Sequence, residues 1–363
     1  MLNCQLIVSE NSNHLQQIYF GFQLLQQDGL IDLEQKIDRK SPCFEKNKKL
    51  PFGAQGGGLK LLLDGSIRIY YDMADAHDID QQSLAWSDYY YKRSYNSEIH
   101  GPASEKIQPL DLNYMVKPNN VSWHNLVRAY QLSSGMEGFK ACIRELDINN
   151  KISYLPRINE LQAEPNPNAP FSILFMCRLW EPNQDDHWQL TKAQQEDRIE
   201  INNMRVDCIR KLKKEFGNEF SGGLAPTAYA QENFRDVVID NSSITSKRNY
   251  IAQLKRYPVC ISTTGLANSI GWKFGEYVAL SKAIVSEKLH SQTAGNIKRN
   301  VNYLEFATAD ECVEQIHKLK SDRQLMASIM RANQNYYLNH LAPDKLVMSS
   351  LQRALNPNLG AKQ

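Results

Sequence analysis

Cysteine pairs, long apolar runs and excess charge are all scarce in this sequence. Its 7 cysteines are odd in number and widely spaced, and no C-x-x-C occurs, so we expect reduced core thiols instead of a disulfide framework or a zinc site. No apolar run approaches the roughly 20 residues that span a bilayer. The start, MLNCQLIVSENSN, lacks the basic and apolar regions of a signal peptide. These absences predict a cytoplasmic protein, which could still contact the inner face of the membrane peripherally.

Net charge is also nearly absent, because 42 basic residues are balanced by 40 acidic ones. A chain whose main task is to coat nucleic acid would carry a basic stripe, so no nucleic-acid partner is expected. What is present is enough apolar material for two cores, since 42% of the 363 residues are hydrophobic. At roughly 150 residues per domain, this length predicts two domains.

The boundary between the two domains is predicted at residues 163–170. This segment, AEPNPNAP, holds three prolines, which can be neither helix interior nor central strand. We therefore expect an N-terminal domain at 1–162, a second domain at 171–335, and a C-terminal helix at 336–363 that packs back on the first domain. Pro343 suits the first turn of that last helix.

Alternating strand and helix patterns on both sides of this segment predict an α/β fold. SILFMC is a continuous apolar run, typical of a strand buried on both faces of a parallel sheet, and PVCIS and AIVSE are predicted to be further strands. A long helix is predicted over 192–216 and ends at Gly217, a residue that adopts positive φ readily. FSGGL, DVVID and YLEF are further strand candidates. In the first half, Asp64-Gly65 between LKLLL and SIRIYYD predicts a hairpin turn.

The most informative segment runs from Ser262 to Glu287, STTGLANSIGWKFGEYVALSKAIVSE. A buried strand leads into a loop of small residues with Gly265, and a helix is predicted to begin near Ser269. A diphosphate suits such a place, because the helix N-terminus is positive and ligands of open α/β sheets bind beyond the carboxyl ends of strands. Lys273 would add charge, and the Glu276 carboxylate could accept two hydrogen bonds from a ribose diol. The alternative is an ordinary helix capped by Ser269, with Lys273 paired to Glu276.

This segment resembles the donor-binding domain of glycosyltransferases of the two-domain GT-B type, in the "group 1" superfamily. In those proteins a small-residue loop precedes a helix ending in E-a-(L/M)-a-x-G-K-P-(I/V)-V, and this chain reads EYVALSKAIV from Glu276. MCRLW resembles the first strand of that domain, which implies that Arg178 contacts the donor phosphates. The resemblance covers roughly the last 200 residues. It implies two Rossmann-like domains facing a cleft, and a nucleotide-sugar donor held by Arg178, Gly265, Asn268, Ser269, Lys273 and Glu276.

One departure from the family pattern concerns stereochemistry. Retaining members carry a second glutamate eight positions before the helix glutamate, and that position here is Asn268. The sugar-facing carboxylate is missing, which favours an inverting mechanism, with a retaining one kept as the alternative. The resemblance also implies that neither a metal nor another cofactor is needed, since basic groups and a helix end stabilise the leaving diphosphate.

An inverting transferase needs a general base near the acceptor hydroxyl. The segment YYDMADAHDID offers candidates at the end of an apolar strand, with Asp75 preferred over Asp72, His77 and Asp78. Its D-x-x-D spacing could also suit a metal, and the plainest alternative is a solvated acidic loop. DYYYKRSY, from Asp88 to Tyr95, combines aromatic and basic groups that suit a sugar acceptor on an anionic carrier, so Tyr90, Lys92 and Arg93 are acceptor-binding candidates. These tyrosines could equally belong to the core.

The sequence thus predicts an enzyme that moves a sugar from a nucleotide-sugar donor to a glycan or lipid-linked saccharide, as in polysaccharide or lipopolysaccharide biosynthesis. An epimerase of the same fold would need acid and base carboxylates in the donor domain, and no such pair is seen. A module that binds nucleotide sugars without catalysis, within a polysaccharide assembly, remains the alternative from another class.

Overall fold

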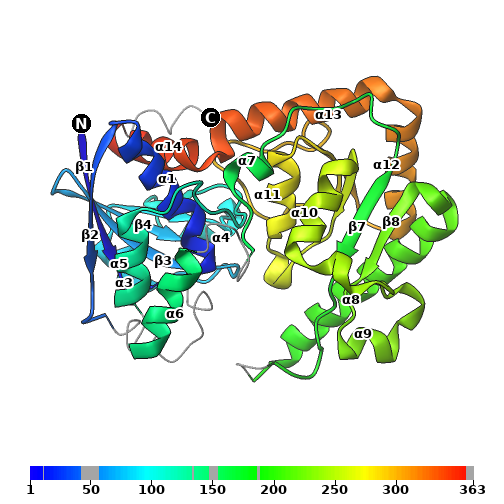
Figure 1. The fold of residues 1–363 in the computed structure, drawn as a ribbon, viewed down its shortest axis with the longest axis horizontal. Coiled ribbons are helices and arrows are strands. Elements are labelled where there is room, and N and C mark those ends of the chain that lie inside the picture. Colours follow the sequence, from blue (N-terminus) through cyan, green and yellow to red (C-terminus); the bar gives the residue numbers. More distant parts are fainter. Residues whose placement is uncertain (11, 42–56, 133–134, 147–153, 186–188, 357–363) are drawn as a thin grey trace. The chain divides into compact units, whose positions relative to one another are not determined.

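The computed structural model describes residues 1–363 except 11, 42–56, 133–134, 147–153, 186–188 and 357–363 (Figure 1). The chain divides into two compact units. Unit 1 comprises Met1–Glu160, Ser291–Asn296 and Leu338–Gln363, and unit 2 comprises Leu161–His290 and Ile297–Tyr337. The return of Ser291–Asn296 to unit 1 had no signal in the sequence pattern.

Unit 1 is built on a mixed sheet in the order β2-β1-β3-β4-β5-β6. β3 runs antiparallel to both β1 and β4, and the other neighbours pair in parallel. The predicted hairpin at Asp64-Gly65 joins β3 to β4 through a three-residue loop, in which Asp64 and Gly65 have φ of 48° and 69°. The strands are β1 Leu2–Val8, β2 Ile31–Ile37, β3 Gly58–Leu63, β4 Ile67–Asp72, β5 Tyr89–Lys92 and β6 Ile107–Pro109.

The C-terminal helix α14, Pro343–Leu355, packs against α1, Gln16–Gln27, within unit 1 (Figure 1). Gly21 permits the close approach, since any side chain there would collide with the Pro343 carbonyl. The Tyr71 hydroxyl contacts the Ser350 hydroxyl at 2.7 Å in the core. The other helices described in this part of the chain are α3 Gln81–Trp86, α4 Ser97–His100, α5 Trp123–Gln131, α6 Gly135–Glu145 and α7 Ile158–Leu161, the last lying at the boundary of the units.

Unit 2 has a wholly parallel sheet in the order β11-β10-β9-β7-β8. Its strands are β7 Ile173–Cys177, β8 Phe220–Leu224, β9 Val259–Ser262, β10 Ala283–Glu287 and β11 Tyr303–Phe306. Chain order reverses between β7 and β9, and this reversal makes a crevice at the carboxyl ends of the two strands. The predicted α/β class, with two sheets flanked by helices, is confirmed.

The helices of unit 2 lie on both faces of this sheet, with α12 packed on α8 and α11 packed on α13. α8 spans Lys192–Phe216, as predicted, because Thr191 and Gln194 form a capping box at its start and Gly217 ends it with φ of 49°. The remaining helices are α9 Ala228–Asn233, α10 Lys247–Arg256, α11 Trp272–Ala279, α12 Ala309–Ser321 and α13 Arg323–Tyr336. None of the helices in the described ranges is long and apolar enough to cross a membrane.

One local prediction is wrong. DVVID does not form a strand, because residues 235–237 turn as a short 3-10 helix and only Val238 bridges to Leu224.

Candidate functional site

The crevice at the switch point of the unit 2 sheet is bounded by the chain that leaves β7 and the chain that leaves β9. Arg205, on the inner face of α8, forms hydrogen bonds with both of these segments. Its guanidinium donates to the Arg178 carbonyl at 2.7 Å and to the Thr264 carbonyl and Thr263 hydroxyl at 3.0 Å each. Burial lowers the pKa of Arg205. Sequence analysis missed this residue, because an arginine in a long amphipathic helix looks like part of a solvated face.

Arg178 follows β7 directly, as predicted, and its side chain is exposed. Its guanidinium lies over the Trp180 ring, 4.0 Å from the centroid. Partial desolvation of the guanidinium by the surrounding protein first, and then the charges of Arg205 and Arg198, lower the pKa of Arg178. Arg198 pairs with Asp185, whereas none of the described carboxylates forms an ion pair with Arg178. The end of β7 therefore holds excess positive charge, which an anionic group would relieve.

Glu276 lies on α11 and is fully buried. One carboxylate oxygen pairs with Lys247 of α10, and the other has no hydrogen-bond partner among the described residues. Leaving a carboxylate oxygen buried and unsatisfied costs free energy, so such an atom marks a place where a donor from a ligand would be gained.

Lys273 lies one turn before Glu276 and donates to the Met176 carbonyl in β7. Its ammonium nitrogen lies 5.1 Å from the centroid of the Tyr250 ring, and that of Lys247 lies 5.3 Å from the same centroid. Burial lowers the pKa of Lys273 to about 8, and the charges of Arg205 and Lys247 act in the same direction. The structure thus brings Lys273, Glu276 and the unpredicted Lys247 together around one tyrosine.

Backbone groups of the loop between β9 and α11 form hydrogen bonds with one another. The Gly265 N–H donates to the Ser269 carbonyl at 2.9 Å, and the Ser269 N–H donates to the Leu266 carbonyl at 3.2 Å. A Cβ at Gly265 would lie 2.6 Å from the Ser269 hydroxyl oxygen, so glycine is needed for this tight loop. The predicted helix start near Ser269 is wrong, because α11 begins at Trp272 with Gly271 as its N-cap. No side chain caps this end, and open space surrounds the Gly271 Cα.

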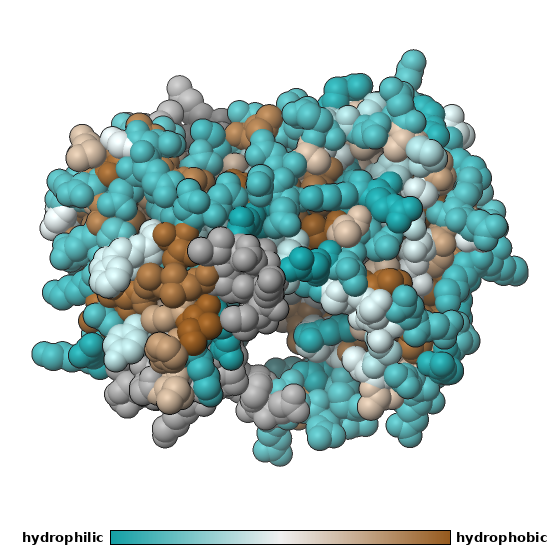
Figure 2. Space-filling view, in the orientation of Figure 1, coloured by the Kyte–Doolittle hydropathy of each residue, from teal (hydrophilic) through white to brown (hydrophobic). Residues whose placement is uncertain are grey.

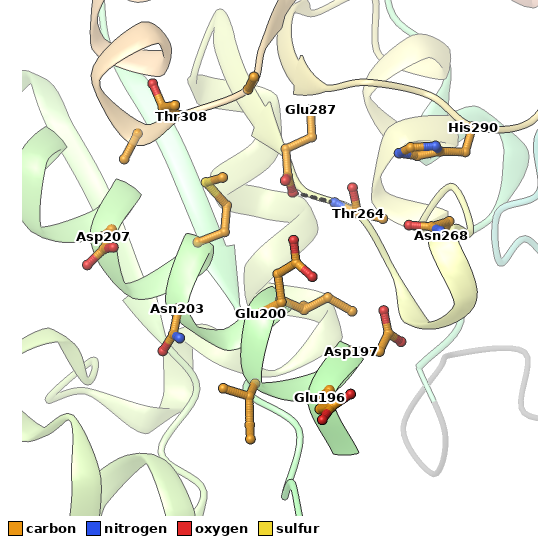
Figure 3. Close-up of a pocket in the computed structure, with 15 residues that line it drawn as sticks. Glu196, Asp197, Glu200, Asn203, Asp207, Thr264, Asn268, Glu287, His290 and Thr308 are labelled. Atoms are coloured by element: carbon orange, nitrogen blue, oxygen red, sulfur yellow. Dashed lines mark hydrogen bonds between the residues drawn. The ribbon is translucent and has the colours of Figure 1, made fainter. Parts of the chain in front are cut away.

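Asn268 also lies in this loop, with φ of 58°. Asparagine tolerates this left-handed conformation better than most residues, whereas Ala267, with φ of 54°, does not gain from it. The Asn268 side chain lines a second hollow of unit 2 (Figure 3).

That hollow has a volume of about 700 Å³ and lies between the first half of α8, the start of α12 and the ends of β9 and β10. Its lining is acidic, with His290 and Thr308 as further polar groups (Figure 3). The Glu287 carboxylate accepts a hydrogen bond from the Thr264 N–H at 2.8 Å, and burial raises its pKa. The carboxylates in the lining are those of Glu196, Asp197, Glu200, Asp207 and Glu287. None of the described lining residues is a lysine or arginine, so this cavity would repel a diphosphate, and Arg178, Lys273 and Glu276 lie outside its lining.

In unit 1, the predicted acidic loop begins with Asp72 at the end of β4. Asp72 is buried, pairs with Lys92 at 2.9 Å and accepts a hydrogen bond from the Tyr90 hydroxyl at 2.5 Å. Parallel pairing of β4 with β5 sets Asp72 opposite Lys92, so the cluster is part of the sheet. Tyr90 and Lys92 are fully buried. This burial corrects the prediction that they bind an acceptor and removes Asp72 from the candidate bases, since all three are occupied with each other in the core.

Asp75 lies farther along the loop and pairs with the predicted acceptor residue Arg93, which is itself buried. The side chain of Asp75 is 44% exposed, so one face of the pair reaches solvent. His14, a few residues after β1, is near enough to this pair for both of their charges to act on its imidazole. Burial lowers the pKa of His14 to about 4, whereas the charge of Asp75 raises it. A neutral imidazole beside a carboxylate can accept a proton. Sequence analysis missed His14, whose only signal was its place shortly after a strand.

The other two members of the acidic loop differ from Asp75. The His77 ring contacts the Ser94 carbonyl at 2.8 Å through Nδ1, which ties it to the backbone. Asp78 is exposed. Across the described residues, no group of three or more His, Cys, Asp or Glu side chains could hold a metal ion.

No known protein family and no curated protein sequence matches the chain. Among solved structures, it is similar to a glycosyltransferase from Rickettsia africae ESF-5, at 12% identity over 96% of this chain and 82% of that one, with a TM-score of 0.42. HepE of Anabaena, solved in complex with UDP-glucose, matches at 12% identity over 95% and 96% of the two chains, with a TM-score of 0.39. The C-terminal domain of a glycosyl transferase group 1 family protein (LpcC) from Francisella tularensis matches at 11% identity over 50% of this chain and 95% of that one, with a TM-score of 0.34. Likeness this distant says nothing about what the present chain binds or does.

Proposed function

We propose that this chain is a glycosyltransferase whose nucleotide-sugar donor binds in unit 2, at the crevice between the ends of β7 and β9. The observation that carries the proposal is the buried carboxylate of Glu276, which has one unsatisfied oxygen. It stands on the helix that follows β9, next to a lysine and within the unit that presents Arg178 and Arg205. The Glu276 carboxylate suits the ribose diol of a nucleoside diphosphate, and the nearby basic side chains suit its diphosphate. All of them lie at the switch point of the sheet, where open α/β sheets bind ligands.

Each residue has a distinct role in this proposal. Glu276 accepts hydrogen bonds from the ribose hydroxyls. Arg178 and Lys273 stabilise the charge that grows on the diphosphate as the sugar departs, an effect that is often the largest in such sites. Arg205 positions Arg178 by holding its carbonyl. Gly265 and Ser269 shape the loop, and Gly271 leaves the start of α11 open to a phosphate.

The acceptor side is proposed in unit 1, at the group formed by Asp75, Arg93 and His14. Either the Asp75 carboxylate or the neutral His14 imidazole takes the proton of the acceptor hydroxyl. Arg93 holds Asp75 in place. Because position 268 is asparagine, no carboxylate stands where a retaining enzyme of the resembled family has its sugar-facing glutamate. We therefore propose inversion at the anomeric carbon without a metal ion.

The acceptor is proposed to be a glycan or a lipid-linked saccharide, and the compartment the cytoplasm. The free thiols of Cys4, Cys142, Cys177, Cys208, Cys260 and Cys312 support a reducing compartment.

The test is a thermal-shift screen with UDP, GDP, CDP, CMP and dTDP, followed by donor hydrolysis with the sugar nucleotide of the best ligand. A ligand that binds only the folded chain raises its melting temperature. We expect one nucleoside diphosphate to stand out and its sugar nucleotide to be hydrolysed slowly without acceptor. Binding without hydrolysis, and without transfer to any saccharide, would identify a non-catalytic module. Absence of any shift would refute the proposal.

A further inference from the structure

Helices α5 and α6 form a hairpin on unit 1 whose large apolar side chains point outward. Trp123 and Tyr130 of α5 are 75% and 59% exposed, and Met136 and Phe139 of α6 are 69% and 59% exposed. Ile143 and Leu146 continue the same row and are exposed as well. Figure 2 shows brown and pale side chains gathered on the part of unit 1 where Figure 1 draws α5 and α6.

Helical residues three, four and seven apart lie on one side of their helix. Met136, Phe139 and Ile143 share one side of α6, and Trp123 and Tyr130 share one side of α5. We call these five residues and Leu146 the outer stripe. Ordinary surface helices show the reverse arrangement, with the apolar side turned to the core.

The inner faces of the two helices explain why the stripe cannot turn inward. Asn125 of α5 donates to the Gln23 side chain of α1 at 3.2 Å, and the buried Arg128 guanidinium lies 3.9 Å from the centroid of the Tyr19 ring. Between the helices, a Cβ at Gly138 would lie 3.0 Å from the Tyr130 carbonyl oxygen, a tight approach that glycine avoids. Polar and small groups fix the hairpin, and the large apolar side chains are left to the outside.

Two basic residues lie beside the stripe. Lys140 is exposed and Arg144 is half-buried, and both follow one edge of the stripe along α6. Glu145 lies on the opposite, inner side of α6. Burial raises the pKa of Glu145, while the charges of Arg128 and Lys117 lower it. Lys140 and Arg144 therefore place two basic groups along one edge of the stripe.

We propose that the outer stripe is a docking surface for an anionic lipid bilayer, on which the helix pair lies without crossing it. Tryptophan, tyrosine and phenylalanine favour the boundary between headgroups and acyl chains, and lysine and arginine pair with anionic headgroups. A protein partner would also bury apolar side chains, but it would not need the basic edge. The proposal goes beyond the proposed function and does not depend on it, although a lipid-linked acceptor would then be met at the surface where it resides.

The test is flotation of the full chain, without nucleotide, with vesicles of phosphatidylcholine containing about 30% phosphatidylglycerol and with vesicles of phosphatidylcholine alone. We expect wild type to float with the anionic vesicles and much less with the neutral ones. The double variant Phe139→Ser, Ile143→Ser should partition at least about tenfold more weakly. The double variant Lys140→Glu, Arg144→Glu should bind anionic vesicles at least about tenfold more weakly than wild type does. Its binding to neutral vesicles should be unchanged. Ile199→Ser, which removes an exposed apolar side chain from α8 of unit 2, should float like wild type.

Three results would overturn the proposal: no flotation of wild type, equal flotation of the Phe139 and Ile143 variant, or a wild-type dimer that this variant dissociates while neither form floats. The last result would identify a second copy as the occupant. Should the double variant not fold, Trp123→Gln gives the same test, since this residue is the most exposed of the stripe. The nucleotide-induced thermal shift, measured on every variant, should match wild type, so that a failure of vesicle binding is distinguishable from a failure of nucleotide binding.

Discussion

The two members of the Glu276–Lys247 ion pair differ in burial. This difference predicts that one substitution mainly lowers stability and the other mainly weakens nucleotide binding. The Glu276 side chain is fully buried and one oxygen has no partner among the described residues, whereas the Lys247 side chain retains 29% exposure. Removal of Lys247 would strand a buried carboxylate. Removal of the Glu276 charge would leave an ammonium group that water can still reach.

The magnitudes follow from this geometry. Breaking a buried pair by deleting one partner costs about 3–5 kcal/mol, and the partial exposure of Lys247 places Lys247→Met near the lower end, at about 3 kcal/mol. For a unit of this size, each kcal/mol lowers the melting temperature by about 2–4 °C, so a drop of about 6–12 °C is expected. Glu276→Gln keeps the volume and removes the unsatisfied charge, so its loss should stay within about 1 kcal/mol.

For nucleotide binding, we expect Glu276 to matter more than Lys247. Glu276→Gln should weaken the preferred nucleoside diphosphate by about 1–3 kcal/mol, or about 5–150-fold, because charged hydrogen bonds to the ribose are lost. The assay is thermal melting of both variants, followed by calorimetric titration with the nucleotide. A Glu276→Gln protein that melts far below wild type and binds nucleotide equally well would refute the reasoning, because Glu276 would then be a structural residue alone.

Three further predictions concern the charges of the two units. Arg178→Ala should lower turnover by about tenfold or more, with little effect on the affinity for the free nucleoside, as steady-state kinetics and nucleoside titration would show; equal losses in both would point to a general packing defect. Because the pKa of Lys273 is lowered to about 8, nucleoside diphosphate affinity should fall as the pH rises from 7.5 to 9.5, and Lys273→Arg should flatten this profile; a flat wild-type profile would exclude Lys273 from the site. Asp75→Asn should cut turnover by about 10²–10⁴ with nucleotide affinity unchanged, and His14→Asn should do the same if the imidazole is the base; full activity in both variants would place the base elsewhere.

Local signals made much of unit 2 predictable from the sequence. The capping box at Thr191 and the glycine at 217 define both ends of α8. Continuous apolar runs give β7, β9 and β10, which are buried on both faces of a parallel sheet. The start of α11 was misplaced because its N-cap, Gly271, offers no side-chain oxygen, and because the loop before it turns through positive φ at Ala267.

Features that depend on long-range pairing could not be predicted in this way. DVVID has the composition of a strand, yet only Val238 makes a bridge. The sequence predicts an acceptor contact at Lys92, because the pairing of Lys92 with Asp72 exists only once β4 and β5 lie in register. The approach of His14 to Asp75, and of Lys247 to Glu276, joins elements far apart in the sequence. Composition alone could not show that the outer stripe faces away from the core, since its spacing equals that of a buried helix face.

The central claim, that a nucleoside diphosphate binds at Arg178, Lys273 and Glu276, is tested most directly by calorimetric titration of four proteins with the preferred nucleotide. These are wild type, Arg178→Ala, Glu276→Gln and Asp207→Asn, the last altering the acidic cavity beside α8. The account predicts one-to-one binding by wild type and by Asp207→Asn with equal affinity, and binding at least about fivefold weaker in the other two variants. Undiminished binding by Arg178→Ala and Glu276→Gln, or a change confined to Asp207→Asn, would contradict it.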